Sequence, residues 1–160
     1  MSYQFNSPEK QSGAVLVISL IMLLALTLTG VSGMQVTSLE EKMAGNMRDQ
    51  NIAFQAAESA LLQAESFILT NSTEASVYAG ANGLLNIANA EPTDYFLASN
   101  WVAANSSIAT NNYGLPEAPR FIIKKFAQNG ADIFFRVTAR AIGKTPGTQI
   151  ILQSVYIRTN

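Results

Sequence analysis

The sequence contains no cysteine and no histidine, and only 13% of its 160 residues are charged. Without cysteine, the chain can form no disulfide, thiolate nucleophile, lipoprotein anchor or zinc site of the cysteine type. Without histidine, it also lacks the usual general base and the commonest metal ligand. These two absences remove the side chains on which many enzymes and metal sites depend.

Charge is missing altogether from one long stretch, because residues 11–39 include no Asp, Glu, Lys or Arg. Within it, residues 14–34 are mostly Ala, Val, Leu, Ile and Met, and as a helix they would span about 30 Å, the thickness of a hydrocarbon core. The alternative is a cleaved secretory signal, with small residues at 31–33 and a mature start at Met34. The apolar run exceeds the usual ~7–15 residues of such a signal, so we expect a transmembrane helix.

Helical periodicity continues beyond the membrane segment, through residues 35–70, with Gly45 as the only interruption. We therefore expect one helix from about residue 14 to about residue 70, whose second half is amphipathic. A coiled-coil dimer is the alternative, but the stripe is rich in alanine and lacks flanking pairs of opposite charge, which favours a sheet packed on it. The apolar stripe follows intervals of three and four residues and consists of Val36, Leu39, Met43, Met47, Gln50, Phe54, Ala57, Leu61, Ala64 and Ile68.

Residues 71–118 are rich in Asn, Ser, Ala and Gly and hold the only tryptophan, Trp101. This composition predicts a long loop with one or two short helices, near 79–89 and 95–104. Long loops within compact domains are often functional or poorly ordered. Trp101 is either a contact residue for a partner or an anchor that holds the loop on the long helix.

From residue 119 to residue 160 the periodicity becomes two, which predicts strands near 121–126, 133–142 and 148–158. Asn129-Gly130 is a strong tight-turn signal between the first two strands. The middle strand alternates an apolar face, which we expect to pack on the helix, with a basic face carrying Arg136 and Arg140. The fold class is therefore α+β, a long N-terminal helix packed against a C-terminal antiparallel meander. Because the basic face lacks an aromatic stacking platform, we expect it to face solvent or protein rather than nucleic acid.

The net charge of −1 hides a strong division along the chain. Residues 36–118 contain two cations and nine acids, a net charge of −7, whereas residues 119–160 contain seven cations and one acid, a net charge of +6. Opposite charges of this kind favour contact between neighbouring copies or partners, and equally between the two parts of one molecule. The sequence leaves both alternatives open.

No combination of residues predicts an enzyme. Glu40 and Glu41 are adjacent and point to different parts of a helix, and the sequence has no Gly-rich phosphate loop and no cluster of metal ligands. We therefore expect no catalytic residue, no cofactor and no metal site.

The order of segments resembles a type IV pilin precursor: a short polar leader, an apolar helix, an amphipathic continuation, a variable loop and a final β-meander. Within that superfamily, the chain is similar to the PilX-type minor pilins. The specific part of this resemblance lies in two strings, LEEKMAGNMRD from Leu39 and FQAAESAL from Phe54, and it is supported by FRVTARAIGK and ILQSVYIR near the end.

The resemblance implies that residues 1–13 are a leader cut after Gly13 by prepilin peptidase, and that Ala14 becomes an N-methylated terminus. The precursor would cross the inner membrane once and then join an extracellular pilus that serves twitching motility and adhesion. Its implied partners are the peptidase, other minor pilins, the major pilin and the assembly platform. The residues implied in filament or helix packing are Ile18, Gly30, Gly33, Glu40, Glu41, Met43, Phe54, Ala57 and Leu61.

One departure from the family pattern concerns the fifth residue after the predicted cut. Pilins generally carry a glutamate there, which is thought to pair with the terminal amine of a neighbour, whereas this chain has Ile18. An unpaired carboxylate in hydrocarbon is costly, so the loss suits a subunit at or near the filament tip that helps to prime assembly. A loss without functional meaning is the alternative. Two other functions also stay open: a minor pseudopilin of type II secretion, and a membrane-anchored binding module outside any filament.

Overall fold

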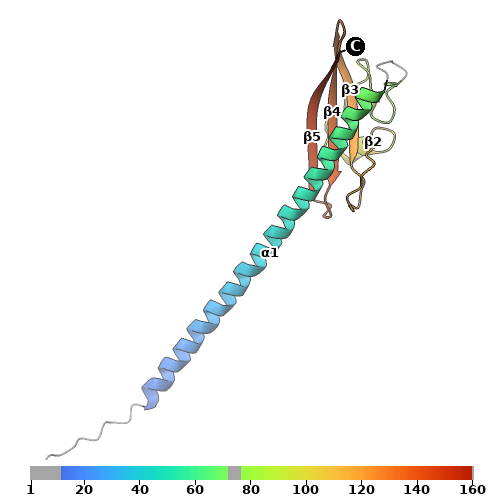
Figure 1. Cartoon of the computed structure of the whole chain (residues 1–160). Coiled ribbons are helices and arrows are strands. Elements are labelled where there is room, and N and C mark those ends of the chain that lie inside the picture. The colour runs from blue at the N-terminus through green and yellow to red at the C-terminus, as the bar shows by residue number, and fades with distance from the viewer. Residues whose placement is uncertain (1–11, 72–76, 160) are drawn as a thin grey trace, which may run out of the picture. The chain divides into compact units, whose positions relative to one another are not determined.

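A computed structural model describes residues 12–71 and 77–159. It contains a helix α1 (Ser12–Thr70) and two short strands β1 (Leu84–Leu85) and β2 (Ser107–Ile108), with a short 3-10 helix η1 (Ala98–Trp101) between them. Three long strands follow: β3 (Arg120–Asn129), β4 (Asp132–Ile142) and β5 (Gln149–Thr159) (Figure 1). The chain divides into two compact units, residues 1–45 and 46–160, and α1 contributes to both.

Two sequence predictions are confirmed directly. The single long helix runs from Ser12 to Thr70, and its interior contains no proline. The three predicted strands appear as β3, β4 and β5, and Gly130 takes a φ of 59° in the turn between the first two, a conformation that favours glycine. The α+β fold class is therefore correct.

The sheet has the order β1-β3-β4-β5, and β2 also pairs with β3. The long strands are antiparallel, whereas β1 runs parallel to β3, so the sheet is more than the predicted meander. A register shift between Lys125 and Ala127 marks a bulge in β3. In contrast, β4 and β5 pair without interruption from Asp132–Thr159 to Ile142–Gln149.

One face of the sheet, here called the inner face, packs on α1 through small side chains. The helix buries Ala60, Ala64 and Ile68 against Phe135, Val137 and Ala139 of β4 in one apolar cluster. A second cluster joins Ala56 and Ala57 to Ala141. Alanines let the sheet backbone approach the helix closely. The two-residue periodicity of β4 arises because alternate side chains of the strand face the helix.

The predicted apolar stripe on α1 faces the sheet from Ala57 onward, as expected. Before Ala57 the prediction is wrong, because other residues of the helix are buried. Met43, Met47 and Phe54 are 62%, 66% and 47% exposed, and the buried positions before Ala57 are instead Asp49, Ala53 and Ala56. An 11-residue strand spans about 36 Å, which matches only about 24 helical residues. The sheet therefore covers the last part of α1 alone, and its close approach over alanine turns Phe54 outward.

The region 71–118 differs from the prediction in two ways. The expected helix near 79–89 is wrong, because this stretch holds turns and β1, and the helix expected near 95–104 is only the short η1. Gly83 explains part of the difference, since its φ is 73° and a Cβ there would lie 2.8 Å from the Cα of Ser106. The chain passes very close to Ser106 at Gly83, and the left-handed conformation of this glycine interrupts any helix through it.

Candidate functional site

The apolar segment of residues 14–34, predicted to cross a membrane and here called the membrane segment, is the first part of the candidate site. The only described helix that is long and apolar enough to cross a membrane is α1, whose most apolar window has a mean hydropathy of 2.6 and no buried residue. Ile18, at the position where a pilin glutamate is expected, is 56% exposed between Val17 and Ser19. The segment therefore presents apolar side chains in all directions and no charge.

Four hydroxyl groups interrupt this apolar surface, and three of them are satisfied within the helix itself. Ser19 donates a hydrogen bond to the carbonyl of Leu16, and Thr27 donates to Leu24, at 2.9 and 2.8 Å. Thr29 donates to Ala25 at 2.8 Å. Because these three donors are occupied, they add no unsatisfied polar group when the segment leaves water for lipid or for a bundle of helices.

The predicted processing residues Gly13 and Ala14 lie in the first turns of α1, while leader residues 1–11 are outside the described residues. A Cβ added at Gly13, Gly30 or Gly33 would meet no atom within 4 Å. Packing inside this chain therefore does not require glycine at 30 or 33. A role for these glycines in contact with another helix stays a prediction.

The other residues predicted for packing fall into two groups. Glu40, Glu41, Met43 and Phe54 are exposed, so they are available to other molecules. Ala57 is fully buried and Leu61 is half-buried, both against the sheet of the same chain. The structure does not bring these predicted residues together into one surface.

Asp49 is a buried residue that holds the fold together, and its role could not be recognised in the sequence. It is 7% exposed, and its carboxylate accepts hydrogen bonds from the backbone amides of Lys144 and Thr145 at 2.6 and 3.1 Å. Burial acts to raise the pKa of Asp49, but the hydrogen bonds from Lys144, Thr148 and Thr145 outweigh it, so the pKa is lowered. This carboxylate fixes the turn between β4 and β5 on the helix. In the sequence Asp49 stands among the polar residues Arg48, Gln50 and Asn51, so nothing in the pattern marked it as buried.

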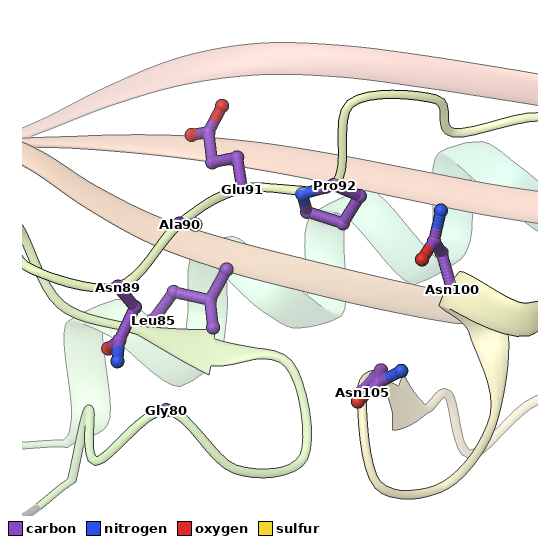
Figure 2. Close-up of a pocket in the computed structure, with 8 residues that line it drawn as sticks. All are labelled: Gly80, Leu85, Asn89, Ala90, Glu91, Pro92, Asn100 and Asn105. Carbon is purple, nitrogen blue, oxygen red and sulfur yellow. The ribbon is translucent and has the colours of Figure 1, made fainter.

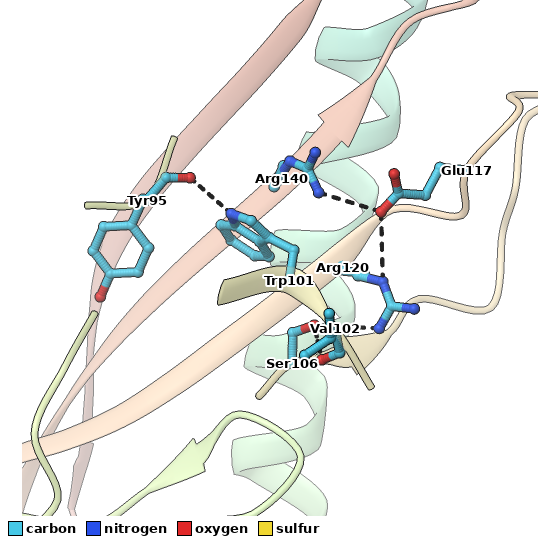
Figure 3. A network of polar contacts seen from close by, with 7 residues as sticks. All are labelled: Tyr95, Trp101, Val102, Ser106, Glu117, Arg120 and Arg140. Atoms are coloured by element: carbon cyan, nitrogen blue, oxygen red, sulfur yellow. Dashed lines mark hydrogen bonds and ion pairs between the residues drawn. The ribbon is translucent and has the colours of Figure 1, made fainter. Parts of the chain in front are cut away.

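Part of the opposite face of the sheet, here called the outer face, is covered by residues of the region 77–118. Arg140 of β4 is 5% exposed, and its guanidinium lies 3.2 Å from the Glu117 carboxylate and 5.6 Å from the centre of the Trp101 ring. Trp101 is buried there and donates its indole hydrogen to the carbonyl of Tyr95 at 2.7 Å (Figure 3). Burial lowers the pKa of Arg140, and Glu117 partly restores it. Trp101 thus anchors the loop on the sheet, not on the helix as one alternative had it.

Further cations of the sheet hold the same region in the same way. The Lys124 ammonium donates to the carbonyl of Asn86 at 2.7 Å and also to those of Ile87 and Asn89. Arg136 forms an ion pair of 2.8 Å with Glu91. An ammonium surrounded by three carbonyls has its hydrogen-bonding capacity filled by the chain itself.

Part of the charge division along the chain is therefore neutralised within one molecule, through Glu91 and Glu117. Among the described residues, the outer-face cations bind acids and carbonyls of the preceding loop, while Arg158 donates to the carbonyls of Ile68 and Asn71 at the end of α1. The expectation that the basic face is turned to solvent or to another protein is wrong. Opposite charges far apart in sequence left this possibility open, and folding brings them together.

A hollow of about 340 Å³ lies in the loop region, lined by Leu85, Asn89, Glu91, Asn100 and Asn105 among others (Figure 2). Its one carboxylate, Glu91, is paired with Arg136. The part of the chain that the structure describes contains no group of three His, Cys, Asp or Glu residues placed to hold a metal. No nucleophile and base meet in this hollow, so no catalytic chemistry can be assigned to it.

Comparison with known families adds two findings. A family model described as PilX N-terminal matches residues 12–62, and one described as type IV pilus assembly protein PilX C-term matches residues 70–158. Neither the curated proteins nor the solved structures gave a match. The two matched ranges coincide with the long helix and with the loop and sheet.

Proposed function

Since the chain belongs to the PilX family of type IV pilus assembly proteins, we propose that this minor pilin sits at or near the filament tip and helps to prime assembly. The family consists of structural subunits rather than enzymes, and it associates with other pilus components. Priming, tip position, twitching and adhesion are the specific parts of the proposal.

The observation that carries the proposal is the membrane segment. Its most apolar window is not buried at all in the chain's own structure, and three of the four hydroxyls of residues 14–34 are satisfied within the helix. Such a helix is stable in lipid, and it is equally stable in a bundle of similar helices where apolar packing replaces acyl chains. A filament subunit must exchange the first environment for the second, and the precursor would do so after cleavage by prepilin peptidase and methylation of Ala14.

Ile18 supports the tip position. A glutamate at this site would need the amine of a neighbouring subunit, and a subunit at the tip has no neighbour beyond it. The apolar, exposed Ile18 carries no such requirement. The subunit would therefore start a filament without placing an unpaired charge in the membrane.

Deletion of the gene tests the proposal, with surface pili counted by electron microscopy and twitching measured on agar. We expect pili to be lost or strongly reduced, and type II secretion to be unchanged. Loss of secretion with normal pili would instead favour the pseudopilus, and no effect on either would favour a membrane-anchored binding module.

Complementation with Ile18→Glu tests the tip position separately. We expect pilus number to stay the same or to fall. Full priming together with more of the protein along the shaft, measured by immunogold labelling, would contradict a role restricted to the tip. Ile18→Leu is the matched control, because it keeps the position apolar.

A further inference from the structure

One border of the sheet is open along its whole length. In the order β1-β3-β4-β5, β5 pairs with β4 on one side, and no described residue forms a backbone hydrogen bond with its other side. Figure 1 shows β5 at the border, away from β2 and the loop region. An edge strand of 11 residues presents a row of unpaired N–H and C=O groups, which is a template for another strand.

The features that usually protect such an edge are absent from most of β5. Residues 149–157 contain no proline, glycine or charged residue, and the strand has no bulge in its register with β4. The one charged residue of β5, Arg158, is engaged with the carbonyls of Ile68 and Asn71. By contrast, the first half of β3, residues 120–124, is paired with β1 and β2 on the side away from β4.

Two neighbouring alternate side chains of this edge strand are apolar and accessible. Val155 and Ile157 lie on the outer face and are 58% and 55% exposed. Ile157 is the register partner of Phe134, and Val155 is the partner of Arg136. Exposed apolar groups at alternate positions would contact alternate side chains of an added strand.

The direction of β5 indicates what can bind there. Its start follows Lys144 and Thr145, which contact Asp49, and its end at Arg158 contacts Ile68. Thus β5 runs in the same direction as α1 between residues 49 and 68. A second copy pairing antiparallel through the same edge would have its helix reversed, which two copies inserted in one membrane in one orientation do not allow. This step rests on the proposed membrane insertion.

We propose that the free edge of β5 accepts an extended segment of a different protein as an added antiparallel strand. The segment carries uncharged, apolar side chains at the alternate positions that face Val155 and Ile157. Its backbone N–H and C=O groups pair with the unpaired groups of β5. The segment is free to run antiparallel to β5 because it is not joined to a membrane helix that fixes its direction. Antiparallel pairing is favoured because it is slightly more stable than parallel pairing.

Site-specific cross-linking tests this proposal on the full chain in the cells that make it. The photoreactive amino acid p-benzoylphenylalanine replaces Gln153, Val155 or Ile157 in turn, and mass spectrometry identifies the cross-linked residue of the partner. The same probe at Ile87, which is 54% exposed but lies in the loop region, is the matched control. We expect the three strand positions to reach one partner segment at residues spaced by two and in the opposite order.

A charged edge should abolish this pairing. In a Val155→Lys, Ile157→Lys double variant, the yield of cross-links from position 153 should fall about tenfold, which corresponds to about 1.4 kcal/mol of binding free energy. Ile87→Lys should leave the yield unchanged, and Trp101 fluorescence should show that both variants are folded.

Three results would overturn the proposal: cross-links to another copy of this chain, partner residues spaced by three or four as on a helix, or yields no higher than at Ile87. The pilus count after deletion is an independent measurement. A regular cross-link pattern together with normal pili in the deletion strain would support the docking edge and contradict the filament role. Loss of pili in the deletion strain without a regular cross-link pattern would support the filament role and contradict the docking edge.

Discussion

Residues 14–34 and residues 49–68 belong to the same helix, yet they differ in the size of their side chains and in what covers them. The first segment is rich in leucine, isoleucine and valine, and all its side chains are exposed in the chain's own structure. The second segment carries an alanine face that the inner face of the sheet buries completely. Large apolar side chains suit contact with lipid, whereas small ones let the sheet pack closely on the helix.

Enlarging a buried alanine should have the largest effect on stability. Ala60→Leu adds three carbons where the helix is fully buried against β4. We expect it to lower the free energy of unfolding of the unit 46–160 by about 1–3 kcal/mol. The measurement is denaturant unfolding of the full chain in detergent micelles, followed by the fluorescence of Trp101. Ala25→Leu in the membrane segment is the control and should change nothing. Equal effects of the two variants would mean that the segments do not differ as described.

The outer face offers a second test, because charge rather than close packing holds it. Arg140→Met removes the ion pair with Glu117 and the contact with Trp101, and we expect a loss of about 1–3 kcal/mol. Glu117 is 41% exposed, so it can regain water and the loss stays below that of a fully buried pair. Lys144→Met, which changes an exposed cation, should leave stability unchanged. If both substitutions have the same effect, the loop is not held by specific cations.

Asp49→Asn should have the smallest effect, and one that depends on pH. The pKa of Asp49 is lowered in the folded chain, so its carboxylate stabilises the fold above its unfolded value, and this contribution is lost as the pH falls through the lower folded value. We expect the difference in unfolding midpoint between wild type and variant to be constant near neutral pH and to shrink below about pH 4. Glu58→Gln, on the exposed side of the helix, is the control. A difference that stays constant down to pH 3 would contradict this role.

Periodicity predicts the elements of this fold because each one obeys a local rule. The helix and the strands β3, β4 and β5 follow from repeats of 3.6 and two residues. The buried face of α1 could not be found in the same way, since Phe54 is as apolar as Ala53 and only the close approach of the sheet selects the smaller one. The cover of the outer face, including the Glu117–Arg140 pair, depends on contacts between residues far apart in sequence. Neither composition nor spacing encodes such a pairing.

The intact mass of the protein recovered from sheared pili and from membranes tests the central claim most directly. If the membrane segment is completed by other pilus subunits after processing, the chain in the pilus fraction begins at Ala14 and carries one extra methyl group. A chain that begins at Met34, or one that keeps its leader and never enters the pilus fraction, would contradict the account.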